Sequence, residues 1–274
     1  MKKIIILTVI ALLVLIYPCI SDNYSAGSYM GSKPLGIDFT SSTATEGPIG
    51  GVLVSTPGVG SKAGKSISTG FSYVNINSDL KLYQIPFSFT YTPIDKLDLS
   101  LSIPYIKLTD IAGGVGDIYT SLKTNRKVID DLQSAVQFSL AVPTGAKRYS
   151  VEAGNSGTND RKNNIDLGLD FIWQREFEQF VINGNMGITM VDMGADNHDE
   201  IIKSGIAFSR SFTKNLGGSI DFLYQTGDSF SSLIAGLGCK YNLDAANSLT
   251  FAIGRDLHKS GVDFLLSAGY SRSF

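Results

Sequence analysis

Apolar and polar residues alternate along most of this chain beyond residue 65, and this alternation limits the possible folds more than any other feature. Between Tyr83 and Tyr91 every second residue is large and apolar, and the residues between them are Gln84, Pro86, Ser88 and Thr90. Successive side chains of a β-strand point to opposite faces, so a period of two is typical of strands with one apolar face. No stretch beyond residue 21 approaches the roughly 18 consecutive apolar residues of a membrane helix. The pattern therefore predicts an all-β protein.

The same alternation predicts twelve strands, most of them ten to thirteen residues long. Strands of soluble sheets are usually about five or six residues long, whereas a tilted strand that crosses a bilayer needs roughly nine to eleven. The predicted lengths favour membrane-crossing strands. The strands are expected at 66–77, 79–92, 97–109, 115–125, 133–143, 163–175, 179–192, 201–212, 216–227, 230–242, 247–257 and 262–274.

Three further features favour a transmembrane barrel over a soluble sandwich. The polar face carries mostly Ser, Thr, Gly, Gln and Asp, and only 18% of the chain is charged, below the roughly 25% of soluble domains. Tight turns at 93–96, 213–215 and 243–246 alternate with longer loops at 110–114, 144–162 and 193–200, as in outer-membrane barrels. Aromatic residues with a polar edge, which suit a membrane boundary, stand near the strand ends: Tyr83, Tyr91, Tyr105, Trp173, Tyr224 and Tyr270.

A bilayer offers no partners for free backbone groups, so the sheet must close on itself. We therefore expect a closed antiparallel transmembrane β-barrel of twelve strands over residues 66–274. Residues 22–65 are rich in Gly and Ser and hold two short apolar pieces. They could fold into the lumen as a plug, stay in the periplasm, or add a hairpin that raises the count to fourteen strands.

The two ends of the chain carry features of an exported barrel. Lys2 and Lys3 precede an apolar run too short for a membrane helix, which predicts a signal peptide over residues 1–21. A lipoprotein reading of Cys19 is less suitable because Tyr17 and Pro18 are not small, and a cut after residue 21 leaves only one cysteine, Cys239. The last strand ends on Phe274, which resembles the signal read by the outer-membrane barrel assembly machinery.

Motifs for catalysis or cofactor binding fail on inspection. The segment Gly58–Ser66 looks like a phosphate loop, but Val59 occupies the position where the loop needs Gly, and a strand follows instead of a helix. His198 and His258 both fall in predicted loops, so neither is expected to form the Ser–His pair that a lipid hydrolase needs. The acidic residues beside His198 lack the spacing of a calcium loop. We expect no enzyme activity, no cofactor and no metal, and the near-neutral charge argues against nucleic-acid binding.

Charged residues on the predicted inner face are the remaining functional candidates. Inside a lumen they could select solutes, or they could pair with one another and fill a narrow barrel; the sequence leaves both open. These lumen-facing candidates are Asp98, Asp117, Lys123, Asp166, Asp170, Asp221 and Asp263.

Three short motifs then follow one another in a recognisable order. They are Ser-Ile-Pro-Tyr at 102–105, Gly-Val-Gly-Asp at 114–117 and Ala-Val-Pro-Thr-Gly at 141–145. Together they resemble the outer-membrane family named after the meta-pathway of phenol degradation, which is described as transporters and is similar to the FadL-type channels. The resemblance covers roughly residues 80–274 and implies passive uptake of small hydrophobic or aromatic compounds.

The sequence thus predicts a channel in the bacterial outer membrane, whose partners are membrane lipid, a small-molecule solute and the barrel assembly machinery. Two alternatives stay open: a barrel that transports nothing and serves as an anchor or surface-interaction module, and an outer-membrane lipid hydrolase. Twelve strands lie between the packed eight-stranded barrels and the water-filled sixteen-stranded pores. Solutes could therefore follow the lumen, or apolar solutes could leave sideways through the wall.

Overall fold

The structure is a computed structural model that describes residues 55–56, 63–75, 81–108, 113–129, 132–144, 165–193, 199–227, 230–258 and 264–274. Within these residues every regular element is a strand, and no helix is long and apolar enough to cross a membrane. The strands are β1 (Lys65–Asn75), β2 (Lys81–Ile94), β3 (Leu97–Leu108), β4 (Gly114–Val115), β5 (Ile118–Ile129), β6 (Leu132–Val142), β7 (Ile165–Glu176), β8 (Val181–Met193), β9 (Asp199–Ser211), β10 (Leu216–Gly227), β11 (Phe230–Asn242), β12 (Asn247–Asp256) and β13 (Phe264–Ser273).

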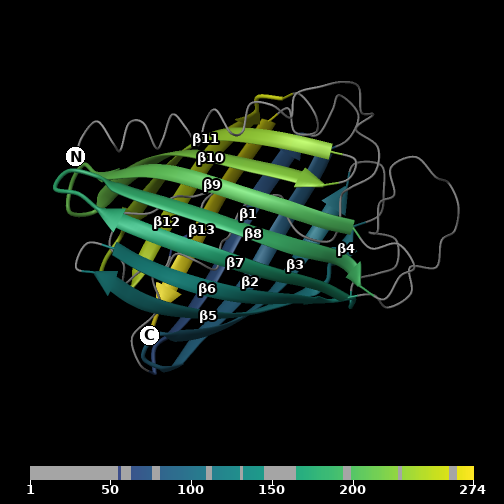
Figure 1. The fold of residues 1–274 in the computed structure, drawn as a ribbon, viewed down its shortest axis with the longest axis horizontal. Helices are drawn as coiled ribbons and strands as arrows, with labels where there is room; N and C mark the ends of the chain where they lie inside the picture. The colour runs from purple at the N-terminus through teal and green to yellow at the C-terminus, as the bar shows by residue number, and fades with distance from the viewer. Residues whose placement is uncertain are drawn as a thin grey trace, which may run out of the picture.

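Twelve of these strands form one closed antiparallel ring (Figure 1). Each pairs with its neighbours in chain order, and the ring closes where β13 pairs with β1. The two-residue strand β4 pairs only with β3 and stands beside the ring. The closure gives each of the twelve ring strands a neighbour on both sides, which is what a sheet surrounded by hydrocarbon requires.

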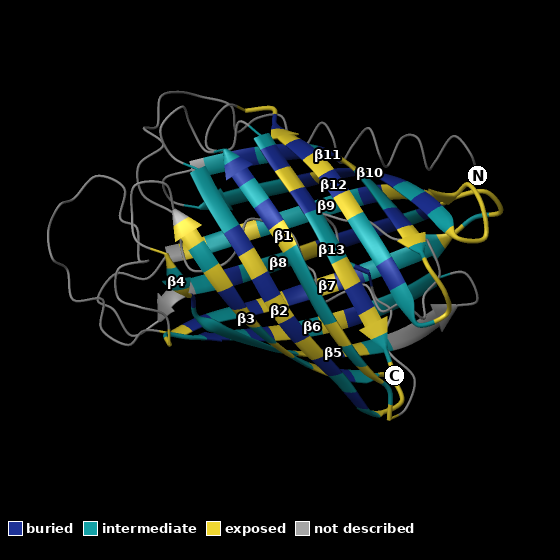
Figure 2. Ribbon diagram, turned by 180° about the vertical axis from the view of Figure 1, so that it is seen from behind, coloured by how far each residue is buried: buried dark blue, intermediate teal, exposed yellow. Residues whose placement is uncertain are grey.

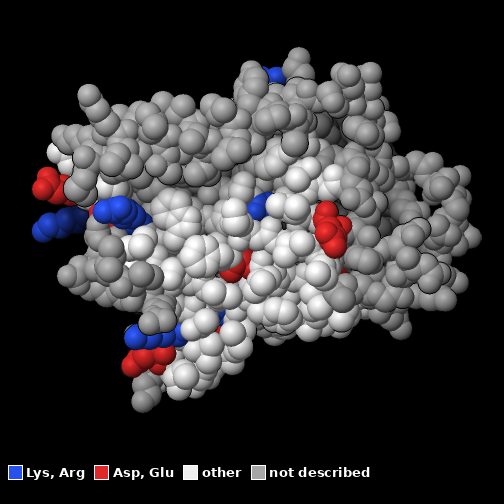
Figure 3. All heavy atoms as spheres, viewed as in Figure 1, with Lys and Arg blue, Asp and Glu red and all other residues white. Residues whose placement is uncertain are grey.

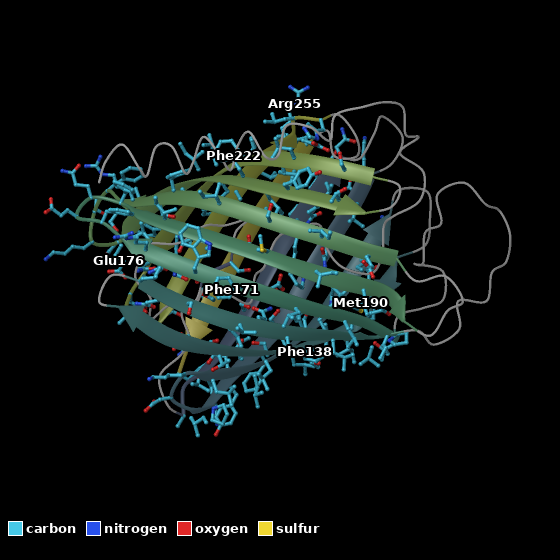
Figure 4. All side chains as sticks on the ribbon, viewed as in Figure 1. Phe138, Phe171, Glu176, Met190, Phe222 and Arg255 are labelled. Atoms are coloured by element: carbon cyan, nitrogen blue, oxygen red, sulfur yellow. The ribbon has the colours of Figure 1, made fainter. Side chains whose placement is uncertain are left out.

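Exposure alternates along the strands, with apolar residues outside and mainly polar residues inside (Figure 2). Phe138, Phe171 and Phe222 lie on the outer face of β6, β7 and β10 and are 47%, 49% and 36% exposed (Figure 4). Their sequence neighbours on the inner face are buried or half-buried. This is the reverse of a soluble sheet, where the large apolar side chains would be the buried ones.

The barrel has two unlike ends. At the turn end, short connections at residues 95–96, 177–180, 212–215 and 243–246 join the strands. The same end holds the closure of the ring, where the backbone N–H of Phe274 donates to the carbonyl of Lys65 at 2.8 Å. The opposite end of the barrel, where β1 ends at Asn75 and β2 begins at Lys81, is called the loop end here.

All twelve predicted strands are present, with boundaries that differ by a few residues. The ring closes with twelve strands, so the alternative of fourteen is wrong. The short strand β4 was not predicted; it forms at the Gly-Val-Gly-Asp motif, where the chain pairs briefly with Tyr105 and Ile106 before β5 begins. The predicted signal peptide and most of residues 22–65 lie outside the described residues.

Candidate functional site

The inner wall of the barrel holds most of the predicted candidates. Their side chains face inward and are almost enclosed, with exposed fractions of 3% for Asp98, 6% for Lys123, 6% for Asp166, 5% for Asp170 and 0% for Asp221. Two candidates differ from this description. Asp117 lies in the connection between β4 and β5 and is half-buried, and Asp263 lies outside the described residues.

Four of the charged side chains belong to one row across neighbouring strands, which we call the charged row. In the inter-strand register each residue of the row lies opposite the next one, and two uncharged residues complete it. The row consists of Asp98 on β3, Lys123 on β5, Gln137 on β6, Asp170 on β7, Gly187 on β8 and Lys203 on β9. Because barrel strands tilt against the axis, such a row winds obliquely around the lumen. Opposite charges thus alternate along one side of the wall.

The ion pair between Asp170 and Lys203 bridges the strand that separates them. Lys203 Nζ lies 2.7 Å from Asp170 Oδ1 and donates a hydrogen bond to Oδ2 at 2.9 Å. Gly187 of β8 lies opposite both residues, and a Cβ atom there would collide with Asp170 Oδ1. The missing side chain at position 187 therefore opens the space that the ion pair occupies.

The other half of the charged row contacts a segment that precedes the barrel. Thr92 Oγ1 donates to Asp98 Oδ1 at 2.6 Å, and Asp98 lies opposite Lys123. Lys123 Nζ donates to the carbonyl oxygen of Thr56 at 3.3 Å, and Thr56 itself is only 4% exposed. Since Lys123 faces inward, Thr56 lies against the inner wall of the barrel.

Two rows of hydroxyl side chains run parallel to the charged row. The first contains Ser273, Ser66, Thr90, Ser100, Ser121, Ser139 and Thr189, interrupted only at Gly168. The second contains Ser248, Ser271, Ser68, Ser88, Ser102 and Tyr119. Neighbours pair directly at Ser88–Ser102, 2.8 Å, Thr90–Ser100, 2.9 Å, and Ser248–Ser271, 2.8 Å. The rows carry hydrogen-bonding groups without formal charge from the turn end toward the loop end.

Several inner-wall residues were missed by the sequence analysis. Lys203 shares the strand face of Ala207 and Ser209, opposite the exposed Phe208, so alternation within 201–212 could have placed it inside. Asp256 could have been found in the same way, since it continues the inner series Ala252 and Gly254. The pairing of Asp170 with Lys203 carried no local signal, because the two residues are 33 positions apart.

The two histidines and the acidic side chains form no metal-binding cluster in the described part of the chain. No group of three His, Cys, Asp or Glu side chains within it could hold a metal ion. His258 lies at the loop end, where its ring meets Tyr224 edge to face at 6.4 Å, and His198 lies outside the described residues.

Charged side chains are unevenly distributed over the described part of the face shown in Figure 3. In Figure 3 the described surface between the ends is mostly uncharged, and Lys, Arg, Asp and Glu gather mainly at the turn end, on the left. There Arg175 lies over the ring of Phe177 at 5.4 Å and Arg272 over that of Phe274 at 5.0 Å. Cations held on aromatic rings suit the boundary between lipid and water.

Comparison with solved structures shows the same fold at low sequence identity. The COG4313 outer membrane channel from Pseudomonas putida F1 superimposes with a TM-score of 0.58 and 14% identity, covering 79% of this chain and 97% of that one. The NanC porin gives 0.54 and 6%, covering 76% and 98%. The KdgM porin gives 0.53 and 11%, covering 76% and 99%. These neighbours are channels and porins; at such identities they establish the architecture alone.

Sequence comparison identifies the family. No curated protein matches the chain significantly. A family model with the description "Putative MetA-pathway of phenol degradation" matches residues 39–274, which include the whole ring and the three motifs singled out above. The chain belongs to that family.

Proposed function

We propose that this protein is a passive channel of the bacterial outer membrane for small hydrophobic or aromatic compounds. One observation carries the proposal: a closed ring of twelve strands presents apolar side chains outward and a polar, charged wall inward. The apolar outer face suits lipid, and the inner wall suits a hydrated passage. The family's description and the channel neighbours support this reading, and the relationship to FadL-type channels stays a prediction.

Transport is tested with purified full-length protein in planar bilayers and with solute uptake by cells that do or do not produce it. We expect a small conductance and faster uptake of an aromatic solute such as toluene. The absence of both conductance and uptake, with a correctly folded barrel, would overturn the proposal.

A sideways route through the wall is supported by an interruption of the sheet. The pairing of β3 with β5 covers only Leu97–Ser102, whereas Pro104 lies beyond it and accepts a hydrogen bond from Gly116 through its carbonyl at 2.8 Å. Pro104 has no N–H group, so it can contribute only its carbonyl to hydrogen bonding on this side of β3. Fewer backbone hydrogen bonds make this the easiest place for β3 and β5 to separate.

A disulfide across β3 and β5 tests the sideways route. Leu101 and Thr120 are register partners, at a separation that suits a disulfide, and would be replaced by cysteine in a Cys239→Ser background. We expect the oxidised protein to lose uptake of toluene but to keep its ion conductance, and reduction to restore uptake. The matched control is the pair Phe138 and Leu169 on β6 and β7, whose crosslinking should change neither. Unchanged uptake in the locked β3–β5 protein would exclude this route.

A second candidate function is that of a barrel that transports nothing. It is favoured by apolar side chains of the inner wall that are almost completely enclosed. Ile172, Ile234 and Leu265 are 0% exposed, and Leu223 is 2% exposed. Such a barrel would act through its loops or as an anchor. It predicts that no variant of the inner wall changes conductance, which separates it from the channel proposal.

We also propose that Phe274 is read by the barrel assembly machinery. Its ring is 65% exposed at the turn end, below Arg272, at the closing strand of the ring. Replacement of Phe274 by Ala should lower the yield of heat-modifiable barrel in the outer membrane, whereas replacement of the exposed Phe212 by Ala should not. Equal yields of both variants would contradict this role.

A further inference from the structure

Two amide side chains on β8 are enclosed within the barrel but incompletely hydrogen-bonded. Asn183 is 0% exposed and Asn185 is 7% exposed, and the Oδ1 atom of each has no hydrogen-bond partner. Asn183 Nδ2 reaches only Ser209 Oγ, at the long distance of 3.4 Å. On β10, the hydroxyl of Ser219 is likewise unpartnered, in a residue that is 6% exposed. We call Asn183, Asn185 and Ser219 the amide cluster.

The amide cluster has apolar as well as polar neighbours on the inner wall. Asn185 lies opposite Ile172 of β7 on one side and Gly205 of β9 on the other, and Gly205 in turn lies opposite Leu223 of β10. Asn183 lies opposite Ala207. Ile172 and Ala207 are fully buried and Leu223 nearly so. Asn183 also lies opposite Gln174 of β7, so the amide cluster lies where an apolar surface of Ile172, Ala207 and Leu223 meets polar side chains.

An enclosed polar atom without a partner costs free energy, so native proteins pair such atoms with protein, water or ligand. Some inner groups do pair directly, as Asp170 does with Lys203, whereas others, such as Ser232 Oγ, have no hydrogen-bond partner. Two unpaired amide oxygens on one strand, β8, with an unpaired hydroxyl on β10 beyond β9, are best explained by a partner that binds and leaves.

We infer that the amide cluster is a binding site within the channel for a small, neutral, mostly apolar molecule that carries a hydroxyl group. The inference rests on the proposed function and names the solute class. The hydroxyl of the solute donates to the amide oxygen of Asn183 or Asn185, and its hydrocarbon part lies against Ile172, Ala207 and Leu223. A pure hydrocarbon leaves the amides unpaired, and an anion meets the carboxylate of Asp221, which lies opposite Ala207.

The test uses phenol and benzene, which have the same ring and differ in the hydroxyl. The full-length protein, labelled with ¹⁵N and placed in lipid nanodiscs, is titrated with each probe while the side-chain amide resonances are recorded. The resonances of Asn183 and Asn185 are assigned by their loss in Asn183→Leu and Asn185→Leu. We expect both amides to shift with phenol and to respond little to benzene.

The variants Asn183→Leu and Asn185→Leu also test how tightly the protein binds phenol and benzene. Each should weaken phenol binding about three- to tenfold, as expected for loss of one neutral hydrogen bond, and leave benzene binding unchanged. Ser267→Ala is the matched control: Ser267 is buried on the inner face of β13 outside the amide cluster, and its removal should change neither probe's binding. A heat-dependent change of mobility in gels verifies that each variant is folded. If only one of the two Leu variants folds, its phenol affinity is sufficient for the test.

Equal responses to phenol and benzene, or wild-type phenol affinity in a folded Leu variant, would overturn the inference. Its failure differs from failure of the proposed function. Solute uptake without a response of the amide resonances would contradict the binding site but not the channel function. A response of the amide resonances without conductance or uptake would contradict the channel function but not the binding site.

Discussion

Asp170 on β7 and Lys203 on β9 form an ion pair across the strand between them, and the absence of a side chain at Gly187 makes this pair possible. Both charged groups are largely enclosed, with 6% and 17% of their side chains exposed. A pair of this kind holds three strands in one register, because a shift of β8 by one residue would bring Met186 or Ile188 to the level of Gly187. The lumen wall is thus fixed in shape at the level of the charged row.

Replacement of Gly187 by Ala should break this arrangement. The added Cβ atom would collide with Asp170 Oδ1 and would lie 2.7 Å from the carbonyl oxygen of Leu169. Overpacking of this kind costs about 1–3 kcal/mol. Urea unfolding of the barrel refolded in lipid vesicles measures the change in the free energy of unfolding. Gly254→Ala is the control, since its Cβ atom would have no neighbour closer than 3.3 Å; an equal loss in both variants would contradict the explanation.

Removing one partner of the ion pair should change the ion selectivity of the channel. Lys203→Met leaves the carboxylate of Asp170 without its cation, so the lumen attracts cations more strongly; Asp170→Asn has the opposite effect. In planar bilayers under a KCl gradient, the reversal potentials of the two variants should move in opposite directions from the wild type, and the double variant should return toward it. Lys96→Met, at an exposed turn, should have no effect. Shifts in the same direction would show that the pair does not face the ion path.

The sequence predicted the ring almost completely because alternation is a local property. Each strand, such as β10 with Ile220 and Phe222 outside and Asp221 inside, shows its two faces in its own residues. The inference that lipid surrounds the barrel depended on the small polar side chains of the inner face. Neither inference required knowledge of which strands are neighbours.

Contacts between strands were beyond the reach of this reasoning. Asp98 and Asp170 were placed on the inner face, but the pairing of Asp170 with Lys203 depends on inter-strand register, which the alternation does not determine. The same holds for the hydroxyl rows, in which the register of neighbouring strands places Ser66 opposite Thr90 and Thr90 opposite Ser100. Asn183 and Asn185 looked like ordinary polar residues, because their lack of partners is visible only in three dimensions.

Lys123 is expected to hold the chain segment before β1 against the inner wall. Its ammonium group donates to the carbonyl of Thr56, and both residues are nearly enclosed. In Lys123→Met this contact is lost, so the passage should widen and the single-channel conductance should rise. Lys240→Met serves as the control, because Lys240 is an equally enclosed inward lysine on β11, a strand distant from β5 in the ring. A rise in both variants would indicate an effect of charge alone.

The turn between β11 and β12 should show a depressed carboxyl pKa. Asp244 accepts backbone hydrogen bonds from Ala246 at 2.7 Å and Asn247 at 2.8 Å, and the Asn247 side chain donates as well, so the pKa of Asp244 lies below its ordinary value of 3.8. Because the folded pKa is lowered, the stabilisation of the turn is present above the unfolded pKa and is lost as the pH falls through the folded one. Carboxyl NMR should give a midpoint below 3.8 that rises in Asn247→Ala; a midpoint at or above 3.8 in the wild type would contradict the hydrogen bonding.

Adjacent residues on β6 test which face of the barrel meets lipid. Phe138 lies near the middle of the strand and is 47% exposed, whereas Gln137 faces inward in the charged row. A lysine at position 138 would place an ammonium group in hydrocarbon, at a cost of about 2–4 kcal/mol near the bilayer midplane. A lysine at position 137 would lie between Lys123 and Asp170, so the carboxylate on one side offsets the like charge on the other, and the new ammonium group would face the lumen. We therefore expect Phe138→Lys to lower the free energy of unfolding in lipid vesicles by that amount and Gln137→Lys to change it little while altering conductance. Both variants have the same charge at neighbouring positions, so only the face differs.

A stable Phe138→Lys barrel would mean that the row of apolar side chains on the outside does not contact lipid, and the channel proposal would lose its physical basis.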